Sequence, residues 1–300
     1  MIQGHSTYHH QKTLGANVKA FLAIFSAITK LRLSLLVVFS ALMSYWFAGV
    51  DLSLNGFIYL GFAGFFITAS SIMMNQIIER DTDKLMERTK NRPLPSNQIS
   101  VVTASVIAGI MAVAGIVILG FCFNPISGLL GALSLISYSF IYTPFKKISP
   151  IAVFIGAVPG SLPLLIGWTA STGSIGLGGV ILFFIQFFWQ IPHFWAIAWI
   201  ANDDYRKAGF HLMPYNEKSR KTALANLPFL ILLILVAATP YFIGMCGIIS
   251  LIVVTLSGIY YMITAIQLST DLSEKSAFRF MFASFYYLPI VLIALNLDKI

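Results

Sequence analysis

Charged residues are scarce in this sequence. Of its 300 residues, 10% are charged and 58% are hydrophobic, whereas ordinary soluble domains carry about 25% charged residues. So few charges cannot cover the surface of a soluble domain of this length, which excludes that class. Apolar runs instead recur along the whole chain, and a run of about 18 or more apolar residues is typical of a membrane span.

Cysteine motifs and a cleavable leader are absent as well. Cys122 and Cys246 lie far apart, and no zinc spacing, CxxC or CxxCH motif occurs. We therefore expect both cysteines to be small packing residues rather than a disulfide. The polar start of the chain, residues 1–13, has no short apolar core followed by a cleavage site, so it is unlike a signal peptide. The expected location is the inner membrane of a bacterium.

Nine apolar segments predict nine transmembrane helices. The alternating ten-residue pattern of a membrane β-barrel is absent, and backbone polar groups in lipid must be bonded internally, so the spans are expected to be helical. At a rise of about 1.5 Å per residue, each segment can cross a hydrocarbon core of about 30 Å. The predicted fold is an all-α membrane bundle, with spans at residues 33–50, 54–78, 101–121, 126–143, 150–169, 176–200, 223–243, 246–267 and 279–297.

The basic residues set the expected orientation. A net charge of +8 would suggest nucleic acid for a soluble protein, but these residues flank apolar segments, so we expect a lipid bilayer and no nucleic acid as partner. With a cytoplasmic N-terminus, every Lys and Arg except Lys299 falls on the cytoplasmic side, and the C-terminus lies outside. Residues 20–28 are too short to span and predict an interfacial helix. This helix belongs to an N-terminal segment, 1–30, ahead of a single membrane domain, 31–300.

Most acidic residues collect in two predicted cytoplasmic loops. The first group begins with Asn75, Glu79 and Asp83, whose spacing puts three oxygen-bearing side chains on one helix face. Hard oxygen ligands suit Mg²⁺, which completes its shell with water and substrate phosphate. The plainer alternative is a solvated helix end whose acids pair with Arg80, Lys84 and Arg88. Asn75 favours a function, because a polar group at the membrane edge is costly without a partner.

Basic residues follow the first acidic group directly. Arg88, Lys90 and Arg92 satisfy the positive-inside rule, which needs only charge. They could equally clamp phosphate oxygens, for which Arg offers a two-pronged donor. The two interpretations are compatible.

A second acidic group, Asp203 and Asp204, follows the sixth span as the first group follows the second span. Adjacent carboxylates repel one another in the absence of a cation. Alone, the pair could be a helix cap or a polar turn. Two acidic groups on the same side of the membrane favour a shared site for a divalent cation.

The sixth span carries polar residues inside an apolar helix. Gln190 and His193 lie in the run W-Q-I-P-H-F-W at 189–195. Polar groups in lipid are expensive, so we expect them to face a cavity. A histidine that is hydrogen-bonded to a neighbouring helix is an equally plain interpretation. Aromatic residues such as Trp189 could line a pocket or pack at the membrane interface.

The motifs resemble the intramembrane prenyltransferase superfamily of the UbiA type and, within it, the protoheme IX farnesyltransferases (heme O synthases). The superfamily pattern N-x-x-x-D-x-x-x-D matches at 75–83, with Glu79 in place of the usual Asp. The run M-E-R-T-K-N-R-P-L at 86–94 looks like that of the family, and D-D-Y-x-x-A-G at 203–209 looks like its second acidic motif. The acidic motifs mark only the superfamily, whereas the block W-Q-I-P-H-F-W-A at 189–196 points to the heme branch. Asn97 stands where Gly is usual, at a left-handed turn position that Asn tolerates.

The resemblance implies a prenyltransferase with nine helices around a central cavity that two cytoplasmic loops cap. Farnesyl diphosphate would be the donor, heme B the acceptor and Mg²⁺ the cofactor. Association with other heme-pathway membrane enzymes would be compatible with it. The implied metal and catalytic residues are Asn75, Glu79, Asp83, Asp203 and Asp204; the diphosphate-binding residues are Arg88, Lys90, Arg92 and Lys207; the acceptor-binding residues are His193, Gln190, Trp189 and Tyr205.

Three other functions compete with this one. The nearest is a related prenyltransferase acting on a quinone precursor or a chlorophyll-like ring. A transporter should carry polar residues along a path through both halves of the bilayer, whereas these acidic groups gather at one face and the outer loops are nearly uncharged. A structural membrane subunit would not need two acidic clusters of this kind.

Overall fold

The computed structural model describes residues 19–50 and 52–300. Over these residues it has helices and no strand, apart from an isolated bridge between Cys246 and Lys299. Nine helices in the described part of the chain are long and apolar enough to cross a membrane, which confirms the predicted fold class. They are α2 (Leu31–Ala48), α3 (Leu54–Ile78), α5 (Val101–Cys122), α6 with η1 and α7 (Pro125–Phe145), α8 (Ala152–Thr172), α9 (Leu177–Ile200), α11 with α12 (Arg220–Phe242), α13 (Ile248–Asp271) and α14 (Glu274–Leu297).

Short polar residues begin several of these helices. Ser53, Ser100, Asn124 and Ser273 each accept a hydrogen bond from a backbone N–H in the first turn of the helix that follows. An N-cap of this type satisfies an amide that has no partner within the helix. The caps therefore explain why the apolar runs begin as helices where they do.

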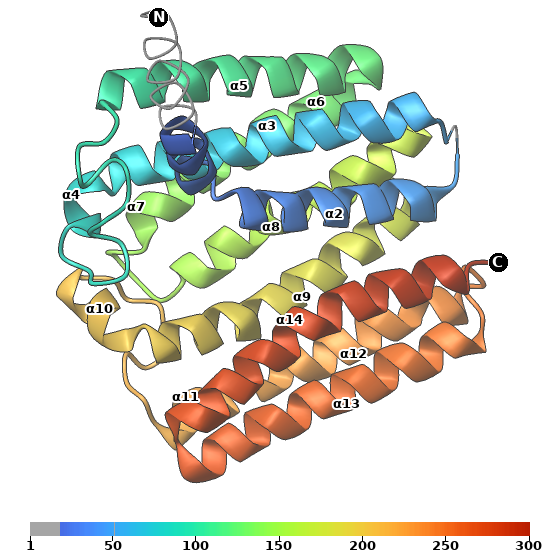
Figure 1. Cartoon of the computed structure of the whole chain (residues 1–300). Coiled ribbons are helices and arrows are strands. Elements are labelled where there is room, and N and C mark those ends of the chain that lie inside the picture. The colour runs from blue at the N-terminus through green and yellow to red at the C-terminus, as the bar shows by residue number, and fades with distance from the viewer. Residues whose placement is uncertain (1–18, 51) are drawn as a thin grey trace, which may run out of the picture.

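The long helices run side by side, and the short helices gather at one end of the bundle. Figure 1 shows α4 (Arg80–Asp83) and α10 (Asn202–Lys207) at the same end, with the C-terminus at the other. The central helices α8 and α9 pack on each other; α2 covers α8, and α12 and α14 cover α9. Both charged loops thus lie at one end, as the positive-inside pattern predicts.

The α2–α8 contact is unusually close. The Ser44 hydroxyl donates to the Leu164 carbonyl oxygen at 2.5 Å. A Cβ added at Gly167 would clash with the Ala41 carbonyl oxygen. Small residues allow membrane helices to approach this closely, because association in lipid depends on packing and interhelical hydrogen bonds. Gly167 is therefore required by the contact itself.

The fourth span departs from α-helical geometry near its C-terminal end. The segment η1 (Ser137–Tyr142) is a π-helix between α6 (Pro125–Ile136) and α7 (Thr143–Phe145). The Thr143 hydroxyl donates to the Tyr138 carbonyl oxygen five residues earlier, at 2.9 Å. Such an insertion changes the direction of the residues that follow, and it is frequent at functional sites. Here those residues include Thr143 and Lys146, which face α3.

A short apolar helix, Lys19–Ile28, precedes α2. Its presence agrees with the helix expected at 20–28, while its place at the membrane interface stays a prediction and residues 1–18 lie outside the described residues. The Gln76 amide donates to the Ile28 carbonyl oxygen at 2.6 Å and ties the helix to α3. The two cysteines are unpaired, as expected; Cys246 is buried, whereas Cys122 is exposed.

We predict that Gly167→Ala destabilises the protein by about 1–3 kcal/mol, because the new methyl group would separate α2 from α8. Gly61→Ala is the control, since a Cβ at Gly61 meets nothing within 4 Å, and it should be neutral or slightly stabilising. The free energy of unfolding in detergent measures both. Equal effects of the two substitutions would contradict the packing described here.

Candidate functional site

Three residues expected to hold a cation lie in a row at the end of α3. Asn75 is in the last turn of α3, Glu79 lies between α3 and α4, and Asp83 ends α4. The predicted continuous helix is interrupted at Glu79, but the four-residue spacing persists in its hydrogen bonds. The Glu79 N–H donates to the Asn75 carbonyl oxygen at 2.9 Å, and the Asp83 N–H donates to that of Glu79 at 2.7 Å. All three residues are buried.

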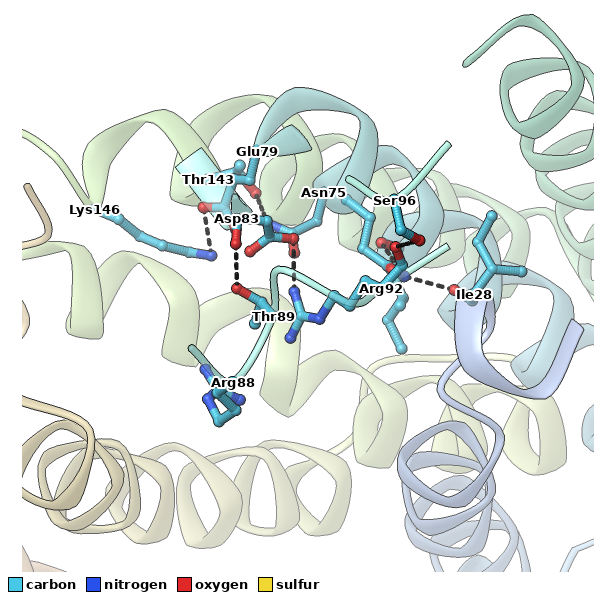
Figure 2. Close-up of polar contacts among 12 residues, drawn as sticks. Ile28, Asn75, Glu79, Asp83, Arg88, Thr89, Arg92, Ser96, Thr143 and Lys146 are labelled. Atoms are coloured by element: carbon cyan, nitrogen blue, oxygen red, sulfur yellow. Dashed lines mark hydrogen bonds and ion pairs between the residues drawn. The ribbon is translucent and has the colours of Figure 1, made fainter. Parts of the chain in front are cut away.

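Each of the three side chains has a partner from another part of the chain. The Asn75 amide donates to the Thr143 hydroxyl at 3.0 Å. Glu79 pairs with Lys146 at 2.8 Å, and Asp83 pairs with Arg92 at 2.8 Å. Figure 2 shows the two cations approaching the acidic residues from different sides.

Of Glu79, Asp81 and Asp83, only Asp81 fits the alternative interpretation of this segment as a solvated helix end. This carboxylate is exposed and pairs with Lys84 at 2.8 Å and Arg80 at 3.4 Å. The hydrogen bond from Lys84, together with the charge of Arg80, lowers the pKa of Asp81. Glu79 and Asp83 are buried instead, so the solvated alternative fails for the two acids that matter.

The motifs did not identify Lys146 as a site residue. Its ammonium lies 4.8 Å from the centre of the Tyr142 ring and 5.6 Å from that of Phe210, besides its contact with Glu79. Burial is the largest single influence and lowers the pKa of Lys146, but the charge and hydrogen bond of Glu79, together with the nearby Tyr138 and Tyr205, raise the net pKa above its ordinary value. Lys146 is therefore a buried cation with aromatic rings around it.

Lys30 is a second cation that the motifs did not single out. It lies between the short N-terminal helix and α2, in the left-handed backbone conformation with φ 44°. Burial, followed by the charges of Arg92, Lys146 and Arg88, lowers the pKa of Lys30 to about 7. Because the charges of these three residues affect Lys30, the four basic side chains must lie near one another. A non-glycine residue held at positive φ is also uncommon and is often found at functional sites.

The second acidic group joins the first through the backbone. The Asp204 carboxylate accepts the N–H of Glu87 at 3.3 Å and that of Arg88 at 3.2 Å. The Arg88 guanidinium lies 5.9 Å from the centre of the Tyr205 ring and 3.5 Å from its hydroxyl. The two charged loops, distant in sequence, are thus held together where they leave α4 and α9.

The remaining charged candidates lie toward solvent. Asp203 is exposed and, among the residues that the structure describes, accepts a single 3.4 Å hydrogen bond, from the Asn202 amide. Lys90 pairs with Glu87 at 2.5 Å, and the Lys207 ammonium is 4.0 Å from Asp204. We refer to the charged residues of the two loops, together with Lys30 and Lys146, as the cap. Within or beside the cap lie Asn75, Glu79, Asp83, Arg92 and Asp204. At its exposed rim lie Asp203, Lys90 and Lys207.

The oxygen ligands fit a divalent cation only in part. Within residues 19–50 and 52–300, no three Asp, Glu, His or Cys side chains form a group that could hold a metal. However, Asp83 Oδ1 is buried and has no hydrogen-bond partner among the described residues. A buried, unpaired carboxylate oxygen is costly. It is therefore a ligand atom that a hard cation would satisfy.

Beneath the cap lies a cavity of about 230 Å³ between the helices. Helices α2, α3, α6, α8, α9 and α14 and the η1 segment line it. Its polar lining includes Gln186, Gln190 and His193, and its aromatic lining includes Tyr138, Tyr142, Trp189, Phe194 and Phe285. Gln190 Oε1 is buried without a hydrogen-bond partner in the described part of the chain. The polar residues of the sixth span therefore do face a cavity.

His193 also bonds to a neighbouring helix, at Nδ1, which lies 2.8 Å from the Ser284 hydroxyl. Both interpretations of this histidine thus hold together. Tyr205 is different, because it lines a separate hollow of about 460 Å³ beside α10 rather than the central cavity. Its contact with the acceptor stays a prediction.

Aromatic rings connect the cavity with the cap. The ring centroid of His193 is 5.9 Å from that of Phe194, and Phe194 is 6.4 Å from Tyr142 in a stacked arrangement. Tyr142 in turn contacts the Lys146 ammonium. A ligand filling the cavity would therefore reach from the histidine to the buried cations of the cap.

A helical membrane bundle with a charged cap over an aromatic cavity defines a multi-pass membrane enzyme for an amphipathic, anionic substrate. The UbiA prenyltransferase family matches residues 37–288. The chain belongs to this family, and it is a prenyltransferase.

Relatives and solved structures agree with this assignment. Proteins named protoheme IX farnesyltransferase are 46% identical in Cytophaga hutchinsonii, covering 91% of this chain and 96% of the relative, and 40% identical in Christiangramia forsetii, covering 93% and 94%. A structure of digeranylgeranylglyceryl phosphate synthase superposes with a TM-score of 0.77 at 18% identity, covering 92% of this chain and 98% of the other. A UbiA homolog from Archaeoglobus fulgidus bound to GPP and Mg²⁺ has a TM-score of 0.68 at 16% identity, covering 91% and 99%.

We predict that Lys146→Met destabilises the protein by about 3–5 kcal/mol, since it leaves the buried Glu79 carboxylate without its cation. The double substitution Glu79→Gln/Lys146→Met should recover much of that loss. Lys84→Met is the matched control, because its pair with Asp81 is exposed, and it should leave the free energy of unfolding nearly unchanged. Unfolding in detergent measures all three. A Lys146→Met effect no larger than that of the control would refute a buried ion pair.

Proposed function

We propose that the protein transfers the farnesyl group of farnesyl diphosphate to a vinyl group of heme B, giving heme O and diphosphate. The observation that carries this proposal is the continuity of the charged cap with a cavity that holds a histidine and aromatic rings. The cap suits a diphosphate, and the aromatic and aliphatic lining of the cavity suits apolar parts of the substrates. The identity to relatives named protoheme IX farnesyltransferase supports heme rather than a quinone precursor as the acceptor.

The basic residues of the cap would bind the diphosphate. Arg92 and Lys146 pair with the acidic residues Asp83 and Glu79. Lys30 lies close enough to Arg92 and Lys146 for their positive charges to lower its pKa. Arg88, Lys90 and Lys207 would add charge at the rim. Donors fixed in place before the reaction stabilise the negative charge that develops on the departing diphosphate.

Magnesium is the proposed cofactor. Asn75, Glu79, Asp83 and Asp204 would hold it, with Asp203 at the rim, and the unpaired oxygen of Asp83 is the observation that favours this ligand set. When bound, the ion would neutralise the diphosphate and so ease its departure. With Glu79 and Asp83 among the residues that would hold the ion, Lys146 and Arg92 would be available to bind the phosphate oxygens.

The cavity would orient the acceptor and exclude water. Breaking the allylic carbon–oxygen bond sends its electron pair to the diphosphate, and the vinyl group supplies the electrons of the new carbon–carbon bond. Water then adds to the carbocation left on the former vinyl carbon and loses a proton, which gives the hydroxyl group of the product. Aromatic and aliphatic walls keep water from capturing the allylic cation first. His193, Gln190 and Trp189 would contact the heme.

Orientation and location follow from the same assignment. We propose that the cap faces the cytoplasm of a bacterial cell, that the protein lies in the inner membrane, and that residues 31–300 form one catalytic domain. The gathering of basic residues near α4 and α10 supports this orientation.

Membranes containing the protein should convert heme B and farnesyl diphosphate to heme O in the presence of Mg²⁺, as detected by mass spectrometry. Asp83→Asn should lower the rate about 100-fold, which is typical for loss of one preorganised electrostatic group. Asp81→Asn, on the same short helix but exposed, should leave the rate unchanged. Prenylation of a quinone precursor but not of heme would refute the proposed acceptor.

His193→Ala should weaken heme binding while leaving the binding of a farnesyl diphosphate analogue intact, because the histidine lies in the cavity rather than the cap. Spectrophotometric heme titration and calorimetry with the analogue separate the two. Equal heme affinity in the variant would remove His193 from the site.

A further inference from the structure

The hydrogen bond at His193 has a defined direction. Ser284 Oγ donates its single proton to the Met281 carbonyl oxygen at 2.5 Å. A carbonyl oxygen can only accept, so the serine hydroxyl has no proton left for the histidine. Ser284 Oγ therefore accepts from Nδ1–H of His193, at 2.8 Å. The neutral ring then carries its proton on Nδ1, and Nε2 has a free lone pair.

The imidazole is also fixed in its plane. The Trp189 ring stacks on it with centroids 4.7 Å apart and an angle of 13°, and Phe285 meets it edge-on at 5.1 Å. The Trp189 indole N–H donates to the Ser284 carbonyl oxygen at 2.8 Å. Ser284 of α14 is thus hydrogen-bonded to both the Trp189 and the His193 rings of α9. Nε2 of His193 has no hydrogen-bond partner among the described residues, and the side chain lines the cavity.

We propose that Ser284 is a positioning residue that presents Nε2 of His193 to the iron of the heme acceptor. This inference rests on the proposed function, since it needs heme in the cavity. A histidine that binds a metal through one nitrogen almost always donates the other N–H to an acceptor, which sets the tautomer and the ring orientation. Ser284 supplies that acceptor inside a membrane helix, where water does not.

Ser284 differs from an ordinary buried serine in a helix. Ser161 of α8 is also fully buried, and its hydroxyl donates to the Ala157 carbonyl oxygen at 2.6 Å. That bond alone satisfies the donor of a buried serine, and Ser161 does not line the cavity. The second, accepting bond to a cavity histidine is what distinguishes Ser284. Ser161→Ala is therefore a matched control.

The first test is heme titration of the purified full-length protein, followed by absorption and by the iron–histidine band in resonance Raman spectra. Ser284→Ala should weaken heme binding about 10- to 100-fold and shift the iron–histidine band, with binding of a farnesyl diphosphate analogue unchanged. Ser161→Ala should match the unmodified protein in both. A Ser284→Ala protein with the same affinity and the same band would overturn the proposal.

The second test replaces the histidine with small ligands. His193→Gly should bind heme with added imidazole about tenfold better than with N-methylimidazole, because only imidazole keeps an N–H to donate to Ser284. In the double variant His193→Gly/Ser284→Ala this preference should vanish. A preference that survives in the double variant would assign it to another group and overturn the proposal.

Failure of the proposed function has a different signature. If the unmodified protein shows no saturable heme binding, heme is not the acceptor, and the role proposed for Ser284 fails together with the proposed function. Saturable binding with a histidine-ligated spectrum that is lost in His193→Ala, but is indifferent to Ser284→Ala, would leave heme as the acceptor and discard only the role of Ser284.

Discussion

Buried charge at the end of an apolar bundle is the constraint on which this structure depends. Glu79 and Asp83 are carboxylates placed where membrane helices end, and neither is exposed enough to rely on water. Their pairs with Lys146 and Arg92 satisfy them in the free protein. Pairs of this kind contribute little net stability, because desolvation offsets attraction. Their presence is better explained by a ligand that needs both signs of charge: a cation for the acids and an anion for the bases.

The fold supplies the position of that charge. The π-helical turn in the fourth span directs Thr143 and Lys146 toward α3. Asp204 then binds the backbone of the loop that carries Arg88. Elements from three separate parts of the chain therefore meet above one cavity. The aromatic contacts from His193 to Tyr142 extend the same site into the membrane.

The sequence predicts those features that depend on residues close together in the chain. The length of the apolar runs predicted the membrane spans, and the distribution of Lys and Arg predicted that both charged loops lie at one end. Turn chemistry gave the left-handed conformation of Asn97, with φ 56°. Contacts between side chains of different helices could not be predicted from the sequence. Nothing near position 146 indicates that Lys146 pairs with Glu79, and no motif indicates that Ser284 is hydrogen-bonded to His193. Lys30 had a visible charge, but its backbone conformation depends on tertiary packing. Asp203 and Asp204 are neighbours in the sequence, yet only Asp204 turns inward.

A structure of the protein with Mg²⁺ and a non-hydrolysable farnesyl diphosphate analogue tests the central claim most directly. The account predicts a diphosphate between Lys146 and Arg92, an ion on Asp83, and a prenyl chain that runs into the cavity toward His193. A diphosphate bound away from these cations, or a chain that lies outside the cavity, would contradict it.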